Sequence, residues 1–340
     1  MNLHQMQPTL PDAPLLADAT PYLPSAIAPS SNALIVRPGQ GLCSQWGGSR
    51  VETLLSCQQT GGQMGVALVN VTEHTGPPLH VHEREDETFI VLEGRFEFQI
   101  RDERFEVGRG DTVFGPRGVP HTFRALEGGG RMCVAFSPGG FEDYFPACEP
   151  LFASGAPDMN ELVRLSADFG LTFLGAYNAN IEAQLQPTLS PRVVRADEGE
   201  RMGPPGEHGR GVLSPLESGG ILLGEVEVDL GAGPPPHVHT REDEVFFVSE
   251  GRFEMWTGDS RTEVGPGTLI YGPRDVPHAW RAIEEGSKVW VWITPGANFE
   301  AFFRALTAMT ASGPPDPVAL SRLGSEYGLV MLGSPESVWL

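Results

Sequence analysis

Apolar and polar residues alternate along short segments of this chain, and glycine-rich turns separate these segments. The clearest alternation predicts strands over residues 88–91, 96–100 and 133–136. Glycines interrupt it at Gly94 and within residues 108–110 and 128–130. Short alternating segments at near-regular spacing are typical of an antiparallel β-sandwich or barrel. We therefore predict a mainly β fold.

The pattern occurs twice along the chain. The segment from Pro77 to Pro138 matches the segment from Pro234 to Pro295 without insertion or deletion, at a constant offset of 157 residues. Beyond it the offset becomes 158, where residues 168–171 match residues 326–329. With roughly 100–200 residues per domain, a chain of 340 residues is expected to form two tandem domains of the same fold.

Each repeat is predicted to end in two short helices. They are expected over residues 141–152 and 162–169 in the first repeat, and over residues 299–309 and 318–327 in the second. Gly170 and Gly328 follow the second helix of each pair, where a C-cap glycine is common.

Composition and the repeat together predict the domain boundaries. Residues 1–33 contain six prolines and no basic residue, which predicts an extended N-terminal arm. Residues 176–191 are polar and end in proline, which predicts a linker. The N-terminal domain is then expected over residues 34–175 and the C-terminal domain over residues 192–340.

Four residues of the first repeat have the chemistry and spacing of a metal site. His80 and His82 lie two apart on a predicted strand, so both imidazoles point to one face. Glu87 follows after a turn-forming polar stretch, and His121 follows a proline- and glycine-containing turn. Three imidazoles and one carboxylate suit Fe, Mn, Ni, Cu, Co or Zn. On a six-coordinate ion they leave two adjacent positions open, which suits catalysis.

The second repeat carries the same set, so we predict up to one divalent transition metal in each domain. Its members are His237, His239, Glu244 and His278. The alternative is that these histidines are satisfied core residues, or that one site is degenerate.

These motifs resemble the two conserved motifs of the cupin superfamily. The first, G-x5-H-x-H-x4-E-x6-G, matches in full from Gly231 to Gly251, and from His80 to Gly94 in the first repeat. The second, G-x5-P-x-G-x2-H-x3-N, matches from Gly110 to His121.

Departures from the family pattern fall at turn and surface positions. His74 stands where the first glycine belongs, and Asp275 replaces the inner glycine of the second motif. Ala125 and Ala282 stand at the position of the closing asparagine. None of these departures removes a metal ligand.

The resemblance covers about residues 34–333 and implies two tandem cupin domains, each an antiparallel jelly-roll barrel with a few short helices. The H-V-H-x-R-E-D-E strings are most similar to quercetin 2,3-dioxygenase-like bicupins. In those enzymes the flavonol 3-hydroxyl binds the metal, the glutamate assists its deprotonation, and the ring opens with loss of carbon monoxide. The resemblance therefore implies a metal-dependent dioxygenase, with iron among the candidate ions and Glu87 and Glu244 as candidate catalytic bases.

Large apolar residues alternate around each predicted site and suggest a pocket for an aromatic substrate. The alternative is that they fill the barrel core. The predicted substrate-binding residues are Phe89, Phe98, Phe114 and Phe123 in the first repeat, and Phe246, Met255, Tyr271 and Trp280 in the second.

The acidic pairs beside the histidines, at residues 85–86 and 242–243, are predicted to form solvated turns, with a supporting role at the metal as the alternative. The neighbouring arginines are expected to form surface salt bridges with carboxylates; they are Arg84, Arg117, Arg241 and Arg274. The alternative for these arginines is to bind an anionic substrate.

Charge and hydropathy restrict the partners. With 23 basic and 44 acidic residues, the net charge of −21 disfavours a nucleic-acid partner. No stretch of 18 apolar residues is present to span a membrane. We also expect no secretory signal, because the sequence near residue 20 lacks an apolar run. We expect a cytoplasmic enzyme whose partners are a small aromatic substrate and O2, while assembly into a homo-oligomer stays open.

Two alternatives to a dioxygenase remain. One is a non-oxidative bicupin, such as an isomerase, a cyclase or an oxalate decarboxylase-like enzyme. Its small polar substrate would match the many aromatic residues poorly. The other is a cupin that binds a metal or a small molecule without turnover.

Overall fold

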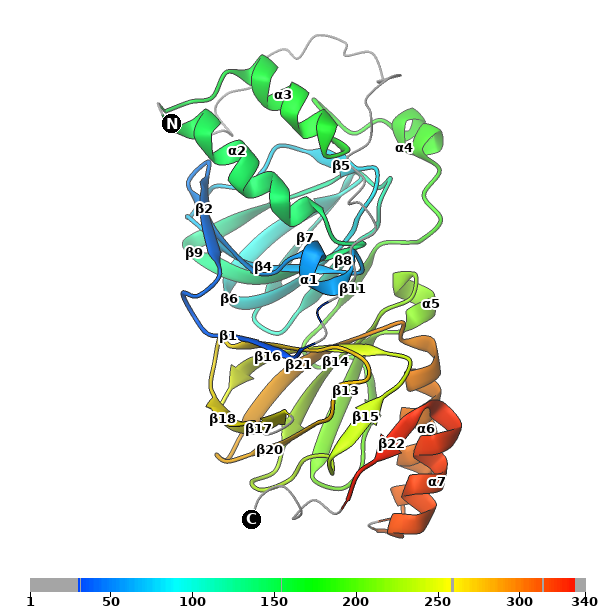
Figure 1. Cartoon of the computed structure of the whole chain (residues 1–340). Coiled ribbons are helices and arrows are strands. Elements are labelled where there is room, and N and C mark those ends of the chain that lie inside the picture. Colours follow the sequence, from blue (N-terminus) through cyan, green and yellow to red (C-terminus); the bar gives the residue numbers. More distant parts are fainter. Residues whose placement is uncertain (1–29, 31, 154, 258–259, 314, 334–340) are drawn as a thin grey trace. The chain divides into compact units, whose positions relative to one another are not determined.

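Antiparallel strands are the main secondary structure of both halves of the chain, so the prediction of a mainly β fold with two tandem domains is confirmed (Figure 1). The computed structural model describes residues 30, 32–153, 155–257, 260–313 and 315–333. The predicted arm over residues 1–33 lies almost entirely outside the described residues. In the described part of the chain, no helix is long and apolar enough to cross a membrane.

The first unit, Gly41–Ala196, is built around a ten-stranded sheet whose path runs β11-β8-β6-β9-β4-β3-β2. Its strands are β2 (Leu42–Trp46), β3 (Ser49–Leu55), β4 (Gly65–Val71), β5 (His80–His82), β6 (Asp86–Ile100), β7 (Glu103–Gly108), β8 (Thr112–Gly115), β9 (His121–Ser137), β10 (Leu171–Phe173) and β11 (Arg192–Val194). Its helices are α1 (Cys57–Thr60), α2 (Tyr144–Phe152), α3 (Met159–Asp168) and α4 (Ala179–Leu185), with a 3-10 turn at Phe141–Asp143.

The second unit contains Ser30–Gln40 and the chain from Asp197 onward. Two sheets form it, in the orders β1-β19-β16-β21-β14-β13-β12 and β18-β17-β20-β15-β22. Its strands are β1 (Leu34–Val36), β12 (Glu200–Met202), β13 (Glu207–Leu213), β14 (Leu222–Val228), β15 (His237–His239), β16 (Asp243–Glu250), β17 (Phe253–Thr257), β18 (Ser260–Val264), β19 (Leu269–Gly272), β20 (His278–Ala282), β21 (Ser287–Thr294) and β22 (Leu329–Met331). Its helices are α5 (Pro215–Ser218), α6 (Ala297–Thr310) and α7 (Pro317–Tyr327).

Two short strands depart from the order expected from the repeat. Residues 34–36, expected to open the N-terminal domain, form β1 and pair with β19 of the second unit, Ile35 opposite Ile270. Residues 192–194, expected to open the C-terminal domain, form β11 and pair with β8 of the first unit. The stretch expected as the linker, residues 176–191, contains α4, whose Glu182 accepts hydrogen bonds from Arg101.

The predicted helix pairs are present at the end of each repeat. α2 and α3 lie together on one side of the first unit, and α6 packs against α7 beside β22 in the second (Figure 1). α3 begins earlier than predicted because Asp158 caps it and accepts a hydrogen bond from the Asn160 backbone N–H. Gly328, with φ 85°, ends α7 as the C-cap glycine that the sequence predicts.

The long strands β6 and β9 bend together as they run around the first jelly roll. Their register shifts between Val91 and Glu93 and again between Gly94 and Phe96, and such irregularities increase the bend of a strand. Gly94 has φ 78° at this point. A Cβ atom there would meet the Gly129 carbonyl oxygen at 2.2 Å, so the bend requires glycine.

We predict that Gly94→Ala destabilises the first unit more than the matched control Gly128→Ala. Both glycines have positive φ, but a Cβ atom at Gly128 would meet nothing within 4 Å. The control isolates the backbone strain, expected at about 1–2 kcal/mol, while the Gly94 variant adds the clash. Free energies of unfolding from urea titrations would test this. Equal losses in the two variants would show that the close approach does not matter.

Candidate metal centres

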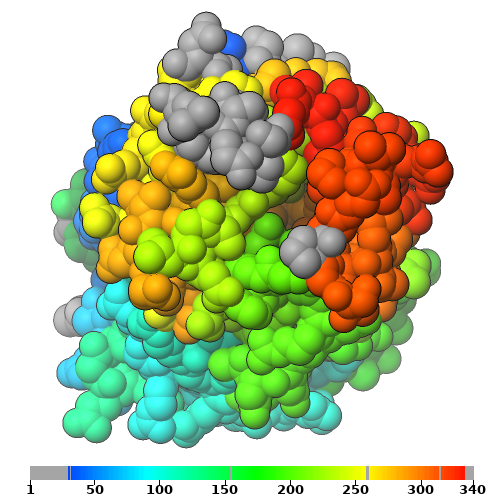
Figure 2. All heavy atoms as spheres, turned by 90° about the horizontal axis from the view of Figure 1, so that it is seen from below, coloured from blue at the N-terminus to red at the C-terminus, as the bar shows by residue number. Residues whose placement is uncertain are grey.

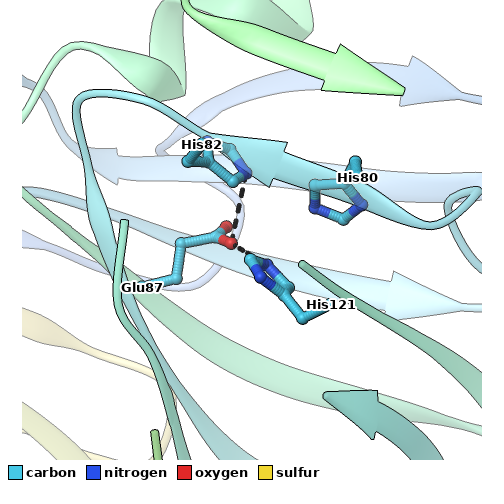
Figure 3. Close-up of side chains that lie close together, drawn as sticks. All are labelled: His80, His82, Glu87 and His121. Carbon is cyan, nitrogen blue, oxygen red and sulfur yellow. Dashed lines mark hydrogen bonds and ion pairs between the residues drawn. The ribbon is translucent and has the colours of Figure 1, made fainter. Parts of the chain in front are cut away.

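Three strands bring four side chains together inside the first barrel (Figure 3). β5 supplies His80 and His82, β6 supplies Glu87 near its start, and β9 begins with His121, which pairs with His80 across the ladder. The four ligand atoms lie within 4.8 Å of one another. Oε2 of Glu87 lies 2.7 Å from Nε2 of His121 and 3.2 Å from Nε2 of His82. All four side chains are buried.

The second barrel repeats this geometry with the second set of residues. β15 supplies His237 and His239, whose Nε2 atoms are 3.1 Å apart. Glu244, near the start of β16, places Oε2 2.9 Å from Nε2 of His278 and 3.2 Å from Nε2 of His239. All four are buried, and their ligand atoms also lie within 4.8 Å of one another.

Backbone carbonyls fix the orientation of two imidazoles in each centre. In the first, Nδ1 of His80 lies 2.8 Å from the Pro78 oxygen and Nδ1 of His121 lies 2.9 Å from the Val119 oxygen. In the second, the Pro235 and Val276 oxygens take the same positions beside His237 and His278. A ring that donates its Nδ1 proton to a carbonyl keeps Nε2 free to bind a metal.

The remaining imidazole of each centre faces a second buried carboxylate. Nδ1 of His82 lies 3.5 Å from Glu85, and Nδ1 of His239 lies 3.6 Å from Glu242. Burial opposes the charged form of both rings and is the largest single effect, but the charges and hydrogen bonds of Glu87 and Glu85 together outweigh it and raise the pKa of His82 to about 9. Glu244 and Glu242 together outweigh burial in the same way at His239 and raise its pKa to about 9.

The pKa shifts of His80 and His237 also agree with metal binding. Burial, followed by the neighbouring imidazoles, holds the pKa of His80 well below its usual value, and the same causes act on His237. These two rings are therefore neutral at pH 7. Nitrogen and carboxylate ligands converging in a buried space fit one divalent transition ion per domain.

The prediction that the acidic pairs form solvated turns is wrong. All four residues are at most 5% exposed; they are Glu85, Asp86, Glu242 and Asp243. Ion pairs with arginines compensate for the burial of the two aspartates. Asp86 accepts two hydrogen bonds from the Arg117 guanidinium and one from its backbone N–H. Asp243 is bound in the same way by Arg274, so the expected salt bridges are confirmed for Arg117 and Arg274. Arg84 donates instead to the Asp168 carbonyl oxygen, and Arg241 to the side-chain oxygen of Asn298.

A third group, formed by Cys57, Glu142 and Asp143, does not resemble the two centres. Both carboxylate oxygens of Glu142 are occupied, because they accept hydrogen bonds from the backbone N–H groups of Cys57 and Gly140. Burial raises the pKa of the Cys57 thiol to about 12, so it is protonated at neutral pH. This group serves the packing of the first unit.

The spaces beside the two centres differ in size. A cavity of about 450 Å³ adjoins His237 and Glu244, whereas about 50 Å³ is left beside His80, His82 and Glu87. Figure 2 shows the second unit hollowed beside the orange and red-orange residues of α6 and α7. These helices contribute Phe299, Phe302, Leu306 and Leu320 to the wall of the larger cavity.

Glycines on β13 and β14 account for part of this difference. The strand registers place Gly209 and Gly211 where the first barrel has Val51 and Thr53. On the next strand Gly224 takes the place of Ala67. The first barrel is filled further by Trp46, Tyr144 and Phe145, which line the small cavity.

The structure distributes the predicted substrate-binding residues between cavity walls and core. Phe89 and Phe123 line the first cavity, and Phe246 and Trp280 line the second. The other four are buried but stand outside the described walls of both cavities; they are Phe98, Phe114, Met255 and Tyr271.

Two kinds of residue that line the cavities were not predicted from the sequence. Phe141 and Phe299 lie against the rings of His82 and His239, with centroids 4.3 Å and 4.9 Å apart. The equivalent positions of these phenylalanines in the two repeats were the signal available for them. Glu207 lies in the wall of the second cavity. It precedes the matched segments, so the repeat gave no indication of its role.

Comparisons with known proteins agree with this geometry. A family model described as a cupin domain matches residues 67–136 and 224–294. Quercetin 2,3-dioxygenase of Bacillus subtilis is 25% identical over 287 residues, which cover 80% of this chain and 85% of that protein. An uncharacterized protein of Streptomyces coelicolor is 31% identical over 80 residues, covering 24% of this chain and 75% of the other.

Among solved structures, a variant of oxalate decarboxylase from Bacillus subtilis is similar, with a TM-score of 0.57 and 18% identity. The match covers 91% of this chain and 92% of that chain. At this level of identity the likeness concerns the fold.

We predict that metal loading at pH 7 releases about one proton per ion, because His82 and His239 must lose a proton before they bind. Affinity should accordingly increase with pH until it levels off near pH 9. Calorimetric titration with Zn²⁺ in two buffers of different ionisation enthalpy would measure the release. A value near zero at pH 7 would contradict the charged state of these rings.

Proposed function

Because the chain belongs to the cupin superfamily and carries one cupin domain in each half, we propose that it is a metal-dependent dioxygenase. Its substrate is a flavonol-like or other enolisable aromatic compound, which it cleaves with O2. The reaction takes place at the centre formed by His237, His239, Glu244 and His278. The ligand set accepts Fe, Mn, Ni, Cu, Co or Zn.

The observation that carries this proposal is the cavity beside the second centre. Its volume of about 450 Å³ is within the range of small-molecule sites, which hold about 300–1,000 Å³. The first cavity, at about 50 Å³, is far below that range. We therefore assign the organic substrate to the second centre.

The charges of the cavity walls favour an aromatic substrate over a small dicarboxylate. The described wall of the first cavity contains no arginine or lysine. In the second, Arg210 is engaged by the Glu225 carboxylate and the Glu198 carbonyl oxygen. A dianion such as oxalate would meet no arginine or lysine in the first wall, and in the second only an arginine that a carboxylate already neutralises. Burial of aromatic rings against apolar walls, by contrast, is favourable. The sequence similarity to a quercetin 2,3-dioxygenase supports the same assignment.

A divalent ion held by the four ligands would stabilise the negative charge that a substrate hydroxyl acquires on deprotonation. The chain itself provides the acceptor for that proton, because Glu244 is the carboxylate of this centre. Phe246 and Trp280 provide apolar wall beside the imidazoles, and Phe299 covers the ring of His239. These side chains hold the substrate and keep water from the reacting group.

We predict that His237→Ala lowers the rate of flavonol-dependent O2 uptake about 100-fold or more, because it removes a ligand from the centre that holds the substrate. The matched variant His80→Ala should retain most of the activity. An oxygen electrode with a small panel of flavonols would measure uptake, and elemental analysis would give the metal content of each variant.

The paired variants separate the two parts of this proposal. Loss of uptake in the His80 variant alone would move the reaction to the first centre. Uptake that persists in both single variants and in the double variant would rule out a dioxygenase reaction at these centres.

A further inference from the structure

Glu207 is a carboxylate that projects into the second barrel. It is the first residue of β13 and lies opposite Val228 of β14. Residues directly opposite each other on neighbouring strands point to the same face of a sheet. Val228 packs in the core of this barrel with Phe246 and Met255. The side chain of Glu207 therefore also points inward, into the cavity that it lines together with His237 and Glu244.

No hydrogen bond or ion pair is formed by this carboxylate among the residues that the structure describes. It is partly buried, and it is not one of the four converging ligands of the metal centre. Burial, followed by the negative charge of Glu244, raises the pKa of Glu207 to about 7. The first effect reflects the apolar surroundings of the carboxylate, and the second reflects a like charge nearby.

The backbone around Glu207 is fixed on both sides. Its N–H donates to the Pro204 carbonyl oxygen at 3.0 Å, and the Gly206 carbonyl accepts a hydrogen bond from Asp229 N–H at 2.9 Å. The same loop is tied to α6, because the N–H of Gly203 donates to Oγ1 of Thr307 at 3.0 Å. A side chain on such a support is well placed to orient a ligand.

The first barrel has no carboxylate at this position. Ser49 begins β3 and lies opposite Val71, as Glu207 lies opposite Val228. Ser49 also lines its cavity. The two barrels therefore share their metal ligands but differ at this wall position, where the roomier cavity alone carries a carboxyl group.

We propose that Glu207 accepts a hydrogen bond from a hydroxyl group of the aromatic substrate, distinct from the hydroxyl that meets the metal centre, and so selects polyhydroxylated substrates. This inference rests on the proposed function and names the substrate class more closely. A carboxylate without a donor in an apolar cavity costs free energy. A substrate hydroxyl would remove that cost, and an analogue without the hydroxyl would leave the acceptor unpaired.

The experiment measures binding without turnover. Protein loaded with redox-inert Zn²⁺ is titrated under anaerobic conditions with two flavonols and followed by absorbance. Kaempferol carries hydroxyl groups on both ring systems, while 3-hydroxyflavone carries only the metal-binding one. The proteins compared are the wild type, Glu207→Ala and Glu207→Gln. Two controls are added: Glu227→Ala, which removes an exposed carboxylate from the neighbouring strand, and Ser49→Ala in the first cavity.

We expect Glu207→Ala to weaken kaempferol binding by about tenfold or more, the effect of removing one partner of a buried hydrogen bond. Binding of 3-hydroxyflavone should stay within about twofold, and so should both ligands in the two controls. Glu207→Gln should recover part of the loss, because its amide oxygen still accepts. Two Zn²⁺ ions per chain in each variant would show that the fold is retained.

Three outcomes would overturn the inference. Unchanged kaempferol binding in Glu207→Ala would exclude the contact. Equal weakening of both flavonols would mean that Glu207 acts on the cavity and not on a hydroxyl. Failure of both flavonols to bind the Zn²⁺-loaded wild type would reject the proposed substrate class together with this inference, which distinguishes it from the first two outcomes.

Discussion

The burial of one carboxylate among three imidazoles is the constraint on which each barrel depends. Glu87 and Glu244 are almost completely removed from solvent, and such a charge is tolerated only beside positive partners. Without metal, protonated His82 and His239 provide that charge. The pairing of β5 with β9 and of β15 with β20 brings the rings into reach. Strand register, ring orientation and charge balance are therefore coupled at these points.

The ligands themselves could be predicted because their chemistry is encoded locally. The spacing of two between His80 and His82 places both rings on one face of any strand. Because the same four residue types occur twice at the same spacing, chance is a poor explanation for that spacing. The mainly β fold followed from the same alternation and from the glycine turns. The helix pairs were also predictable, since Gly328 marks the end of α7 in the sequence.

Features set by distant parts of the chain could not be predicted in the same way. Phe98 and Met255 have the same alternating pattern as Phe89 and Phe246, yet only the latter two line a cavity. Burial of Asp86 depends on Arg117, which lies 31 residues away and reaches it through a turn. The pairing of β1 with β19 joins a segment that precedes the matched repeats to a strand within the second one. Such outcomes depend on packing between elements, and neither the period of the hydrophobic pattern nor the spacing of residues in the sequence predicts that packing.

The two barrels show how duplicated metal chemistry can be separated from substrate access. Their ligand sets have nearly the same distances, and the same carbonyl contacts hold the rings. The walls differ, because Gly209 and Gly211 make room where Val51 and Thr53 fill it. Glu207 then adds an acceptor where Ser49 is neutral. Since both centres offer an ion the same ligands, the difference in proposed function must arise from these walls: the metal centre defines the chemistry, and the cavity defines which molecule reaches it.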